Sequence, residues 1–280
     1  TANAIIMANG IPVCVDIDKN FHLDTKKVEL AITNNTFAIM PVHLYGHFTN
    51  ALALKDICEE KNLFLIEDAS QGVGVTDDLG NYAGTVGDVG ILSFYGNKFV
   101  TSAQGGMVLA KKPEILDKVK QLKNHGRANK GTFWHEAIGF NFCTSDLHCA
   151  LGYAQLKRFK DIQKKKLKIF QIYQENLKNI TQISLDKIDL SVPCYWFISL
   201  WAEDVKNLQA FLEEKNIQTR RAFPPLSKQP CYFDYENIIF HDDPMSTEIY
   251  RTYLSLPSSA MLENADIEYV CNAIQSFYES

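Results

Sequence analysis

Apolar and polar positions alternate in short blocks up to about residue 115. Runs of four to six mostly apolar residues are separated by stretches with helical spacing, the pattern of an α/β layer architecture. A helix is expected to begin near Thr49 and Asn50, and another is expected at the start of the chain, capped by Thr1 and closed by Gly10. The expected strands are residues 11–16, 37–42, 63–67, 89–94 and 106–110.

The pattern changes from Thr144 onward. Apolar residues recur with a helical period over more than thirty positions, which predicts one long helix that links two parts of the fold. A strand (195–201), a helix (204–215), a second strand (218–223) and a helix from Ala265, capped by Asn264, follow. Trp196 and Trp201 are expected in the core of a small domain. The predicted organisation is a large domain over residues 1–155 and, over 156–280, the linking helix with a smaller α+β domain.

Composition and charge narrow the function classes. The 280 residues are 46% hydrophobic and 22% charged, with a net charge of -5, so a nucleic-acid surface with clustered Lys and Arg is not expected. No apolar run approaches the length of a membrane span. The seven cysteines are widely spaced and form no Cys-x-x-Cys pair, which favours reduced thiols in a cytoplasmic protein.

Lys98 and Asp68 are the candidate catalytic residues. Asp68 follows the expected strand 63–67, and Lys98 follows the expected strand 89–94, so both lie where open α/β sheets bind ligands. A lysine amine condenses with an aldehyde, and a carboxylate can hold a pyridine nitrogen protonated. The pair therefore favours pyridoxal 5'-phosphate as cofactor. Taken singly, each residue has an ordinary alternative: a surface lysine, and an acid that caps a local turn.

Three further features are weaker signals. Ser93 and the turn around Thr101 and Ser102 offer hydroxyls and amides to a phosphate, and Gly105 permits close backbone approach. Ordinary turns explain most such glycines. His43 and His47 have a spacing that suits a metal on a helix, but this segment contains Pro41 and Gly46, so a loop without metal is expected.

Seven ordered motifs together resemble the DegT/DnrJ/EryC1/StrS family of sugar aminotransferases, over essentially the whole chain. Each motif alone is weak, but their common order is far more specific. They are residues 41–46 (PVHLYG), 66–71 (IEDASQ), 87–89 (GDV), 93–98 (SFYGNK), 105–108 (GGMV), 124–127 (NHGR) and 139–142 (GFNF).

The resemblance implies a fold type I, aspartate aminotransferase-like enzyme with a mixed, mostly parallel sheet, which works as a homodimer with active sites at the subunit interface. By matching motifs, Lys98 would bond covalently to pyridoxal 5'-phosphate and Asp68 would pair with its ring nitrogen. Gln71 would contact the ring, Ser93 would hold the phosphate, and Asn141 would reach the phosphate in the neighbouring subunit.

The resemblance is greatest to the perosamine-type branch. It implies transfer of an amino group from glutamate to a nucleotide-linked 4-keto-6-deoxysugar, for amino-sugar and cell-surface glycan biosynthesis. Arg127, Arg220 and Arg221 are candidates for the diphosphate, because guanidinium binds phosphate oxygens in a bidentate manner. Two alternatives stay open. One is a sugar dehydratase, whose family members carry His at the position of Lys98, and the other is a non-catalytic binding or regulatory protein.

Three departures from the family pattern concern this chain. Cys143 stands where family members often carry a basic residue, and Ala103-Gln104 replaces the more usual Gly-Glu. In the family, a segment with a Gly-Thr phosphate-binding turn and a stacking aromatic precedes the position of Thr1. The large domain is therefore expected to be N-terminally incomplete.

Overall fold

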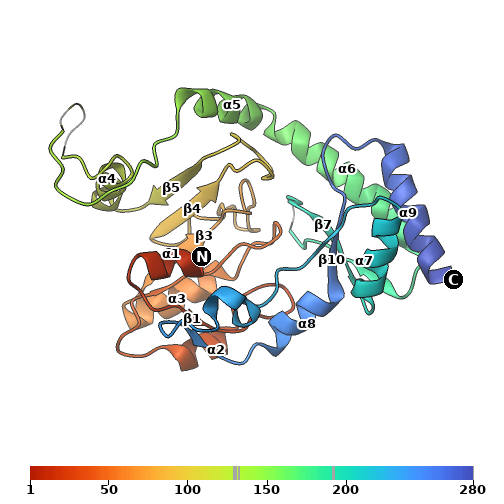
Figure 1. The fold of residues 1–280 in the computed structure, drawn as a ribbon, viewed down its shortest axis with the longest axis horizontal. Helices are drawn as coiled ribbons and strands as arrows, with labels where there is room; N and C mark the ends of the chain where they lie inside the picture. Colours follow the sequence, from red (N-terminus) through yellow and green to blue (C-terminus); the bar gives the residue numbers. More distant parts are fainter. Residues whose placement is uncertain (129–130, 132, 191–192, 280) are drawn as a thin grey trace.

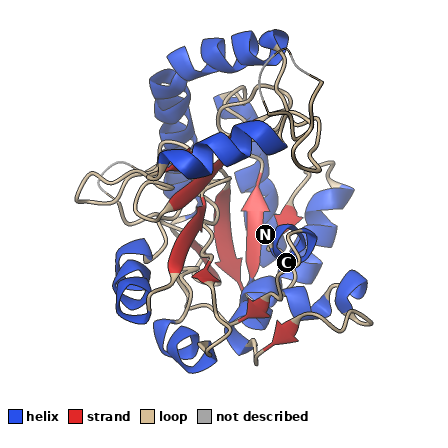
Figure 2. Ribbon diagram, turned by 90° about the vertical axis from the view of Figure 1, so that its left-hand side faces the viewer, coloured by secondary structure: helices blue, strands red, loops and turns tan. Residues whose placement is uncertain are grey.

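A four-stranded sheet occupies the N-terminal half in the computed structural model, which describes residues 1–280 except 129–130, 132, 191–192 and 280. Its order is β2 (Ala38–Ile39), β3 (Phe64–Asp68), β4 (Val89–Ser93) and β5 (Gly106–Ala110). The first three strands are parallel and β5 is antiparallel to β4. The strands lie at the centre with helices outside them (Figure 2). The predicted mixed sheet is confirmed, although β2 is shorter than expected.

Helix α3 (Ala51–Lys61) connects β2 to β3 and shows why the sequence folds this way. Its helical spacing turns Ala51, Leu54 and Cys58 to one face, and all three are buried with Leu65 of β3. The helix ends at Asn62 in the left-handed conformation, as a C-terminal cap requires. The other helices of this half are α1 (Ala2–Met7), α2 (Thr25–Ala31) and α4 (Pro113–Leu122).

A second sheet, entirely antiparallel, forms in the C-terminal half. Its order is β6 (Ile183–Leu185), β7 (Ile198–Ala202), β10 (Tyr253–Leu256) and β8 (Arg220–Arg221). Leu200 and Leu254 are fully buried in its core, against Leu208 and Leu212 of α7 (Val205–Glu214) and Ile274 of α9 (Asn264–Glu279). This arrangement agrees with the smaller α+β unit expected from the sequence.

The prediction of one long linking helix is wrong in one respect. The segment forms two helices, α5 (Asp146–Lys157) and α6 (Phe159–Leu177), with Arg158 between them in a non-helical conformation. Phe159 accounts for the break, because its ring is held in the first half, 5.1 Å from the ring of Phe99 and directly over Gly74. The two helices run along one edge of the molecule from the first sheet to the second (Figure 1).

The chain returns to the N-terminal half after β8. Strand β9 (Ile239–Phe240) pairs in parallel with β1 (Val13–Cys14), so the expected strand 11–16 is short and lies outside the main sheet. In Figure 1 this blue segment lies beside the orange N-terminal elements. The two 3₁₀ turns η1 (Leu226–Lys228) and η2 (Pro230–Tyr232) precede it, and α8 (Pro244–Thr252) follows. The division at residue 155 stays a prediction, and residues far beyond it pack on the first half.

Asp16 joins the returning segment to the first half. Its buried carboxylate accepts hydrogen bonds from the Ser246 hydroxyl, from the amides of Met245 and Ser246 and from Lys27 Nζ, at 2.7 to 3.1 Å. Burial alone would raise the pKa of Asp16, but these donors outweigh it and lower the pKa to about 2.

Asp16→Asn is therefore expected to destabilise the fold by about 2 kcal/mol at neutral pH. A lowered pKa gives stability that is present above the unfolded value near 4 and is lost as the pH falls through about 2. Chemical denaturation of both proteins checks this, and the difference in unfolding free energy should shrink below pH 4. Asp56→Asn, on the exposed face of α3, is the control and should change little. A difference that persists unchanged at pH 2 would contradict the assignment.

Candidate active site

The carboxyl ends of β3 and β4 bring the predicted residues to one edge of the main sheet. Asp68 is the last residue of β3 and pairs with Ile91 of β4, while Ser93 ends β4 two positions further on. Lys98 follows in a turn in which its amide donates to the Tyr95 carbonyl at 2.9 Å. Because parallel strands end at the same edge, residues distant in sequence meet here.

Asp68 is held as a carboxylate. Its Oδ2 accepts from the Thr1 hydroxyl at 2.7 Å and its Oδ1 accepts from the Ser70 amide at 3.1 Å. Burial opposes ionisation, but the hydrogen bonds outweigh burial and the pKa of Asp68 is lowered. Thr1 thus uses its hydroxyl on Asp68, and the expected side-chain cap of α1 by Thr1 is not formed.

The Lys98 amine lies over the ring of Trp196. Its Nζ is 4.3 Å from the centre of the Trp196 ring, and Trp196 Nε1 donates to the Asn97 carbonyl at 2.8 Å. Burial lowers the pKa of Lys98, and the Asp68 carboxylate acts on it in the opposite direction. The carboxylate is thus near enough to influence the amine. A lowered pKa raises the fraction of free amine, which is the nucleophilic form.

Trp196 is a site residue that the sequence did not reveal. It was expected in the core of the small domain, but it belongs to a buried cluster that joins the two halves and includes Phe21, Tyr45 and Tyr253. The Tyr45 and Trp196 rings are nearly parallel at 6.3 Å. In the sequence, the position of Trp196 just before β7 is the signal that could have indicated a site residue. No local sequence pattern links Trp196 to Lys98, which lies nearly a hundred residues earlier.

A cavity of about 920 Å³ opens beside Lys98, between the two halves. Lys98 and Thr101 line it from the first half, Lys166 from α6, and Trp196 and Arg220 from the second half. This volume is in the range of sites that bind small molecules and cofactors. Asp68, Gln71 and Ser93 do not belong to its lining and lie at the sheet edge.

The remaining sheet-edge residues are positioned by local hydrogen bonds. Gln71 Oε1 accepts from the Tyr45 amide at 2.9 Å, and Ser93 Oγ accepts from the Tyr95 amide at 3.4 Å. Gly105 adopts φ +144°, and a Cβ there would lie 2.8 Å from Ser102 Oγ, so the turn requires glycine.

These residues fit pyridoxal 5'-phosphate. The Lys98 amine has a lowered pKa and faces a cavity large enough for a cofactor and a substrate. The Asp68 carboxylate, ionised and near enough to act on that amine, suits a protonated ring nitrogen. A serine hydroxyl and a tight glycine turn lie at the neighbouring strand end, where a phosphate group can approach the backbone.

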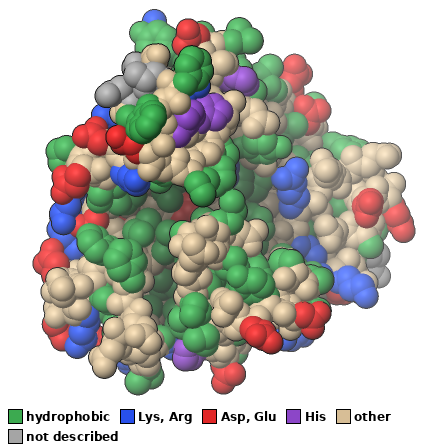
Figure 3. Space-filling model, turned by 60° about the vertical axis from the view of Figure 1, so that its left-hand side comes forward, with side chains coloured by type: hydrophobic (Ala, Val, Ile, Leu, Met, Phe, Trp, Pro, Cys, Tyr) green, Lys and Arg blue, Asp and Glu red, His purple; other side chains and the backbone are tan. Residues whose placement is uncertain are grey.

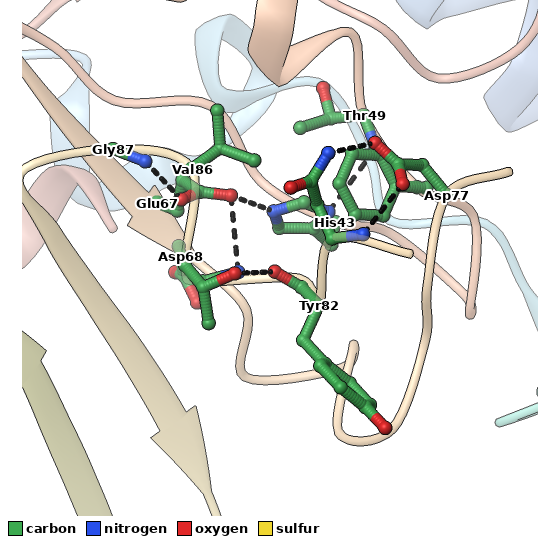
Figure 4. A network of polar contacts seen from close by, with 12 residues as sticks. His43, Thr49, Glu67, Asp68, Asp77, Tyr82, Val86 and Gly87 are labelled. Carbon is green, nitrogen blue, oxygen red and sulfur yellow. Dashed lines mark hydrogen bonds and ion pairs between the residues drawn. The ribbon is translucent and has the colours of Figure 1, made fainter. Parts of the chain in front are cut away.

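A buried hydrogen-bond network supports the strand that carries Asp68 (Figure 4). Glu67 Oε2 lies 2.9 Å from His43 Nε2, and Glu67 also accepts from the amides of Gly87 at 2.6 Å and Gly84 at 3.1 Å. The Thr49 amide donates to His43 Nδ1 at 3.2 Å, so Nε2 carries the proton and donates to Glu67. Burial opposes ionisation of Glu67, but these donors outweigh it and lower its pKa.

Glu67→Gln is expected to destabilise the protein by about 3 kcal/mol, because an amide turns donor atoms toward groups that themselves donate. Glu67 and Asp68 are adjacent on β3, so their side chains point to opposite faces of the sheet. The change should therefore loosen the sheet edge that carries Asp68 and leave the residues that line the cavity in place. Chemical denaturation at neutral pH measures the loss, with the exposed Glu60→Gln as control. Equal stabilities for Glu67→Gln and the wild-type protein would refute the role of the network.

The predicted arginines and Asn141 are dispersed. Arg220 lines the cavity, with its guanidinium 5.8 Å from the Phe197 ring centre. Arg221 points elsewhere, 4.1 Å over Tyr250, and donates to the Tyr250 carbonyl. Arg127 lies 4.9 Å from the Phe133 ring centre, and exposed Asn141 pairs with Asn124 in the segment after α4. Neither Arg127 nor Asn141 lines the cavity beside Lys98.

The two histidines weighed as metal ligands each bind a carboxylate. His43 contacts Glu67, and His47 Nε2 lies 2.8 Å from Asp186 Oδ2. Within the part of the chain that the structure describes, no three His, Cys, Asp or Glu side chains are arranged to hold a metal ion. In the same part, no helix combines the length and the apolar character needed to cross a bilayer.

Solved structures of known proteins share this fold. Helicobacter pylori PseC, an aminotransferase involved in the biosynthesis of pseudoaminic acid, superposes with a TM-score of 0.91 over 100% of this chain and 76% of that one, at 22% identity. At that identity the likeness shows the fold. The chain therefore has the fold of this aminotransferase, with a lysine and an aspartate at the edge of its main sheet.

The family model places the chain more closely. The DegT/DnrJ/EryC1/StrS aminotransferase family matches residues 1–275, and the chain belongs to this family. It is 33% identical to GDP-perosamine synthase of Escherichia coli O157:H7 over 99% of this chain and 76% of that protein. It is 32% identical to dTDP-4-amino-4,6-dideoxy-D-glucose transaminase of Shigella dysenteriae, over 98% and 76%. The predicted family, fold type, aminotransferase class and pyridoxal 5'-phosphate cofactor are confirmed.

Proposed function

We propose that this protein transfers an amino group from glutamate to the keto carbon of a nucleotide-linked 4-keto-6-deoxysugar, in the cytoplasm, for amino-sugar and cell-surface glycan biosynthesis. The observation that carries the proposal is Lys98 on the wall of a cavity of about 920 Å³, within the influence of the Asp68 carboxylate. The names of two relatives, a GDP-perosamine synthase and a dTDP-4-amino-4,6-dideoxy-D-glucose transaminase, support a nucleotide sugar as acceptor.

Each proposed role follows from the position of the residue. Pyridoxal 5'-phosphate, when bound, supplies a carbonyl that bonds amines and a ring that accepts electrons. Lys98 would hold that carbonyl, and its free amine would move a proton at the reacting carbon. Asp68 keeps the ring nitrogen protonated. Gln71 contacts the ring from beside Asp68, and Ser93 donates its hydroxyl to the phosphate.

Of the three predicted arginines, Arg220 is best placed for the substrate diphosphate, since it lines the same cavity as Lys98. Adjacent residues of a strand point to opposite faces, so Arg221 on the same strand packs on Tyr250. Arg127 and Arg221 remain proposed diphosphate residues with less support from their positions. A guanidinium suits a diphosphate because it offers two parallel donors.

A second copy of the chain is the proposed partner, with Asn141 reaching the cofactor phosphate of that copy. Helix α5 has no buried residue, and four large apolar side chains are exposed on it: Leu147, Leu151, Tyr153 and Leu156, with Leu147 81% exposed. Phe140 and Phe142, beside Asn141, are also exposed, with stacked rings 4.9 Å apart. Hydrophobic side chains gather around a hollow on the face shown in Figure 3. Such an apolar surface suits a protein interface.

The test is direct. The protein loaded with pyridoxal 5'-phosphate is incubated with glutamate and GDP-, dTDP- or UDP-linked 4-keto-6-deoxysugars, and the products are separated by mass. A 4-amino sugar formed together with 2-oxoglutarate is the expected result. A deoxygenated sugar as the main product would instead establish a dehydratase, and the absence of any amino sugar with all three nucleotides would overturn the proposal.

A further inference from the structure

Lys166 is a buried cation on the wall of the Lys98 cavity. It is 8% exposed, and its Nζ donates to the Trp196 carbonyl at 2.8 Å. Among the described residues, no carboxylate lies within 4.0 Å of its nitrogen. Burial lowers the pKa of Lys166 to about 8. A buried lysine with one carbonyl partner is poorly compensated, so its contribution to stability does not explain its presence.

A continuous set of contacts leads from Lys166 to Lys98. Lys166 binds the backbone of Trp196, the Trp196 indole N–H donates to the Asn97 carbonyl at 2.8 Å, and the Trp196 ring lies under Lys98 Nζ at 4.3 Å. All four residues line the same cavity: Lys166, Trp196, Asn97 and Lys98. The Lys166 contact therefore holds the backbone of Trp196. The Trp196 indole in turn contacts both the Asn97 carbonyl and the Lys98 amine.

Helix α6 gives Lys166 a rigid base. One turn further along Ile169 and Phe170, and two turns further along Tyr173, are buried in the core of the second half. At the other end of the helix, Phe159 packs against the Phe99 ring of the first half. Lys166 lies between these two anchors. Lys166 therefore couples the relative position of the two halves to the position of Trp196 in the cavity.

We infer that Lys166 is a positioning residue for Lys98, acting through Trp196. The inference rests on the proposed role of Lys98 and not on the identity of the sugar. Without the Lys166 contact, the Trp196 segment loses its tie to α6, and the Lys98 amine samples orientations in which it does not face an incoming carbonyl. Misplacement of a reacting group lowers the rate of bond formation without unfolding the protein.

The experiment follows capture of pyridoxal 5'-phosphate by the cofactor-free protein, through the absorption band of the lysine-bound cofactor. Lys166→Met keeps the length of the side chain and removes the charge. Capture is expected to slow about tenfold, with a melting temperature equal to or above that of the wild-type protein. Lys166→Arg, which can still donate to the Trp196 carbonyl, should recover part of the rate.

Lys164→Met is the matched control, because Lys164 lies two residues before Lys166 on α6, is exposed and does not line the cavity. It removes the same charge without touching Trp196 and should leave capture unchanged. In a Trp196→Phe background, Lys166→Met should add little, since the path to Lys98 is already interrupted.

The outcomes separate the inference from the proposed function. Equal capture by the wild-type protein and Lys166→Met, or equal slowing by Lys164→Met and Lys166→Met, would overturn the inference alone. Full additivity with Trp196→Phe would also overturn it. No capture by the wild-type protein would overturn the proposed role of Lys98 and, with it, the inference.

Discussion

Lys98→Ala should abolish amino transfer, with a loss of about 10⁴-fold or more, because one residue both holds the cofactor carbonyl and moves the proton. The change should also remove the absorption band of the lysine-bound cofactor. The fold should survive, since the Lys98 side chain is only half-buried and its turn is held by backbone contacts of Lys98 and Asn97. Initial rates with glutamate and the keto sugar, together with a spectrum, measure both effects.

Two controls make the result specific to the amine. Lys98→Arg keeps a positive charge at the cavity wall but offers a guanidinium, which does not form the covalent bond, so it should be as inactive as the alanine variant. Lys164→Met removes an exposed charge from α6, outside the cavity, and should stay active. Retention of the absorption band in Lys98→Ala would show that a different lysine binds the cofactor.

The meeting of Asp68 and Lys98 at one sheet edge was predictable because its signals are local. Asp68 and Lys98 each follow a short apolar strand, and the carboxyl ends of neighbouring parallel strands must meet at one edge. The strands β3, β4 and β5 were predictable for a similar reason, since short apolar runs between turn residues define them in sequence. Local pattern therefore determined both the sheet and the edge that carries the chemistry.

The other features depend on contacts between distant segments. Trp196 meets Lys98 through packing of the two halves, and Lys166 reaches Trp196 from a helix whose spacing looks like a solvated face. The break at Arg158 arises because Phe159 packs on Phe99, sixty residues earlier. Periodicity reports which face of an element is apolar but not which segment covers it.

The same distinction explains the buried carboxylates. Asp16 and Glu67 are both fully enclosed, and each is stabilised by donors from segments remote in sequence, Ser246 for Asp16 and His43 for Glu67. In sequence they are ordinary acids next to strands. Their donors become visible only when the chain is folded, and burial of a charge without those donors would be too costly.

Asp68→Asn should lower the rate of amino transfer about 10²- to 10³-fold while leaving stability and cofactor capture nearly intact. The asparagine oxygen can still accept from the Ser70 amide and its NH2 group can donate to the Thr1 hydroxyl, but the side chain carries no charge, so it does not keep a ring nitrogen protonated. Glu67→Gln, at the neighbouring position, should by contrast reduce stability.

A cofactor analogue methylated at the ring nitrogen provides the decisive version of this experiment, because its positive charge is permanent and needs no carboxylate to hold a proton. With the analogue, Asp68→Asn should recover much of the lost rate relative to its own rate with pyridoxal 5'-phosphate. Asp68→Glu, which keeps the charge on a longer side chain, should lie between the wild-type protein and Asp68→Asn. If the analogue restores nothing while the Asp68→Asn protein remains folded and binds it, Asp68 acts on the position of the ring and not on its charge.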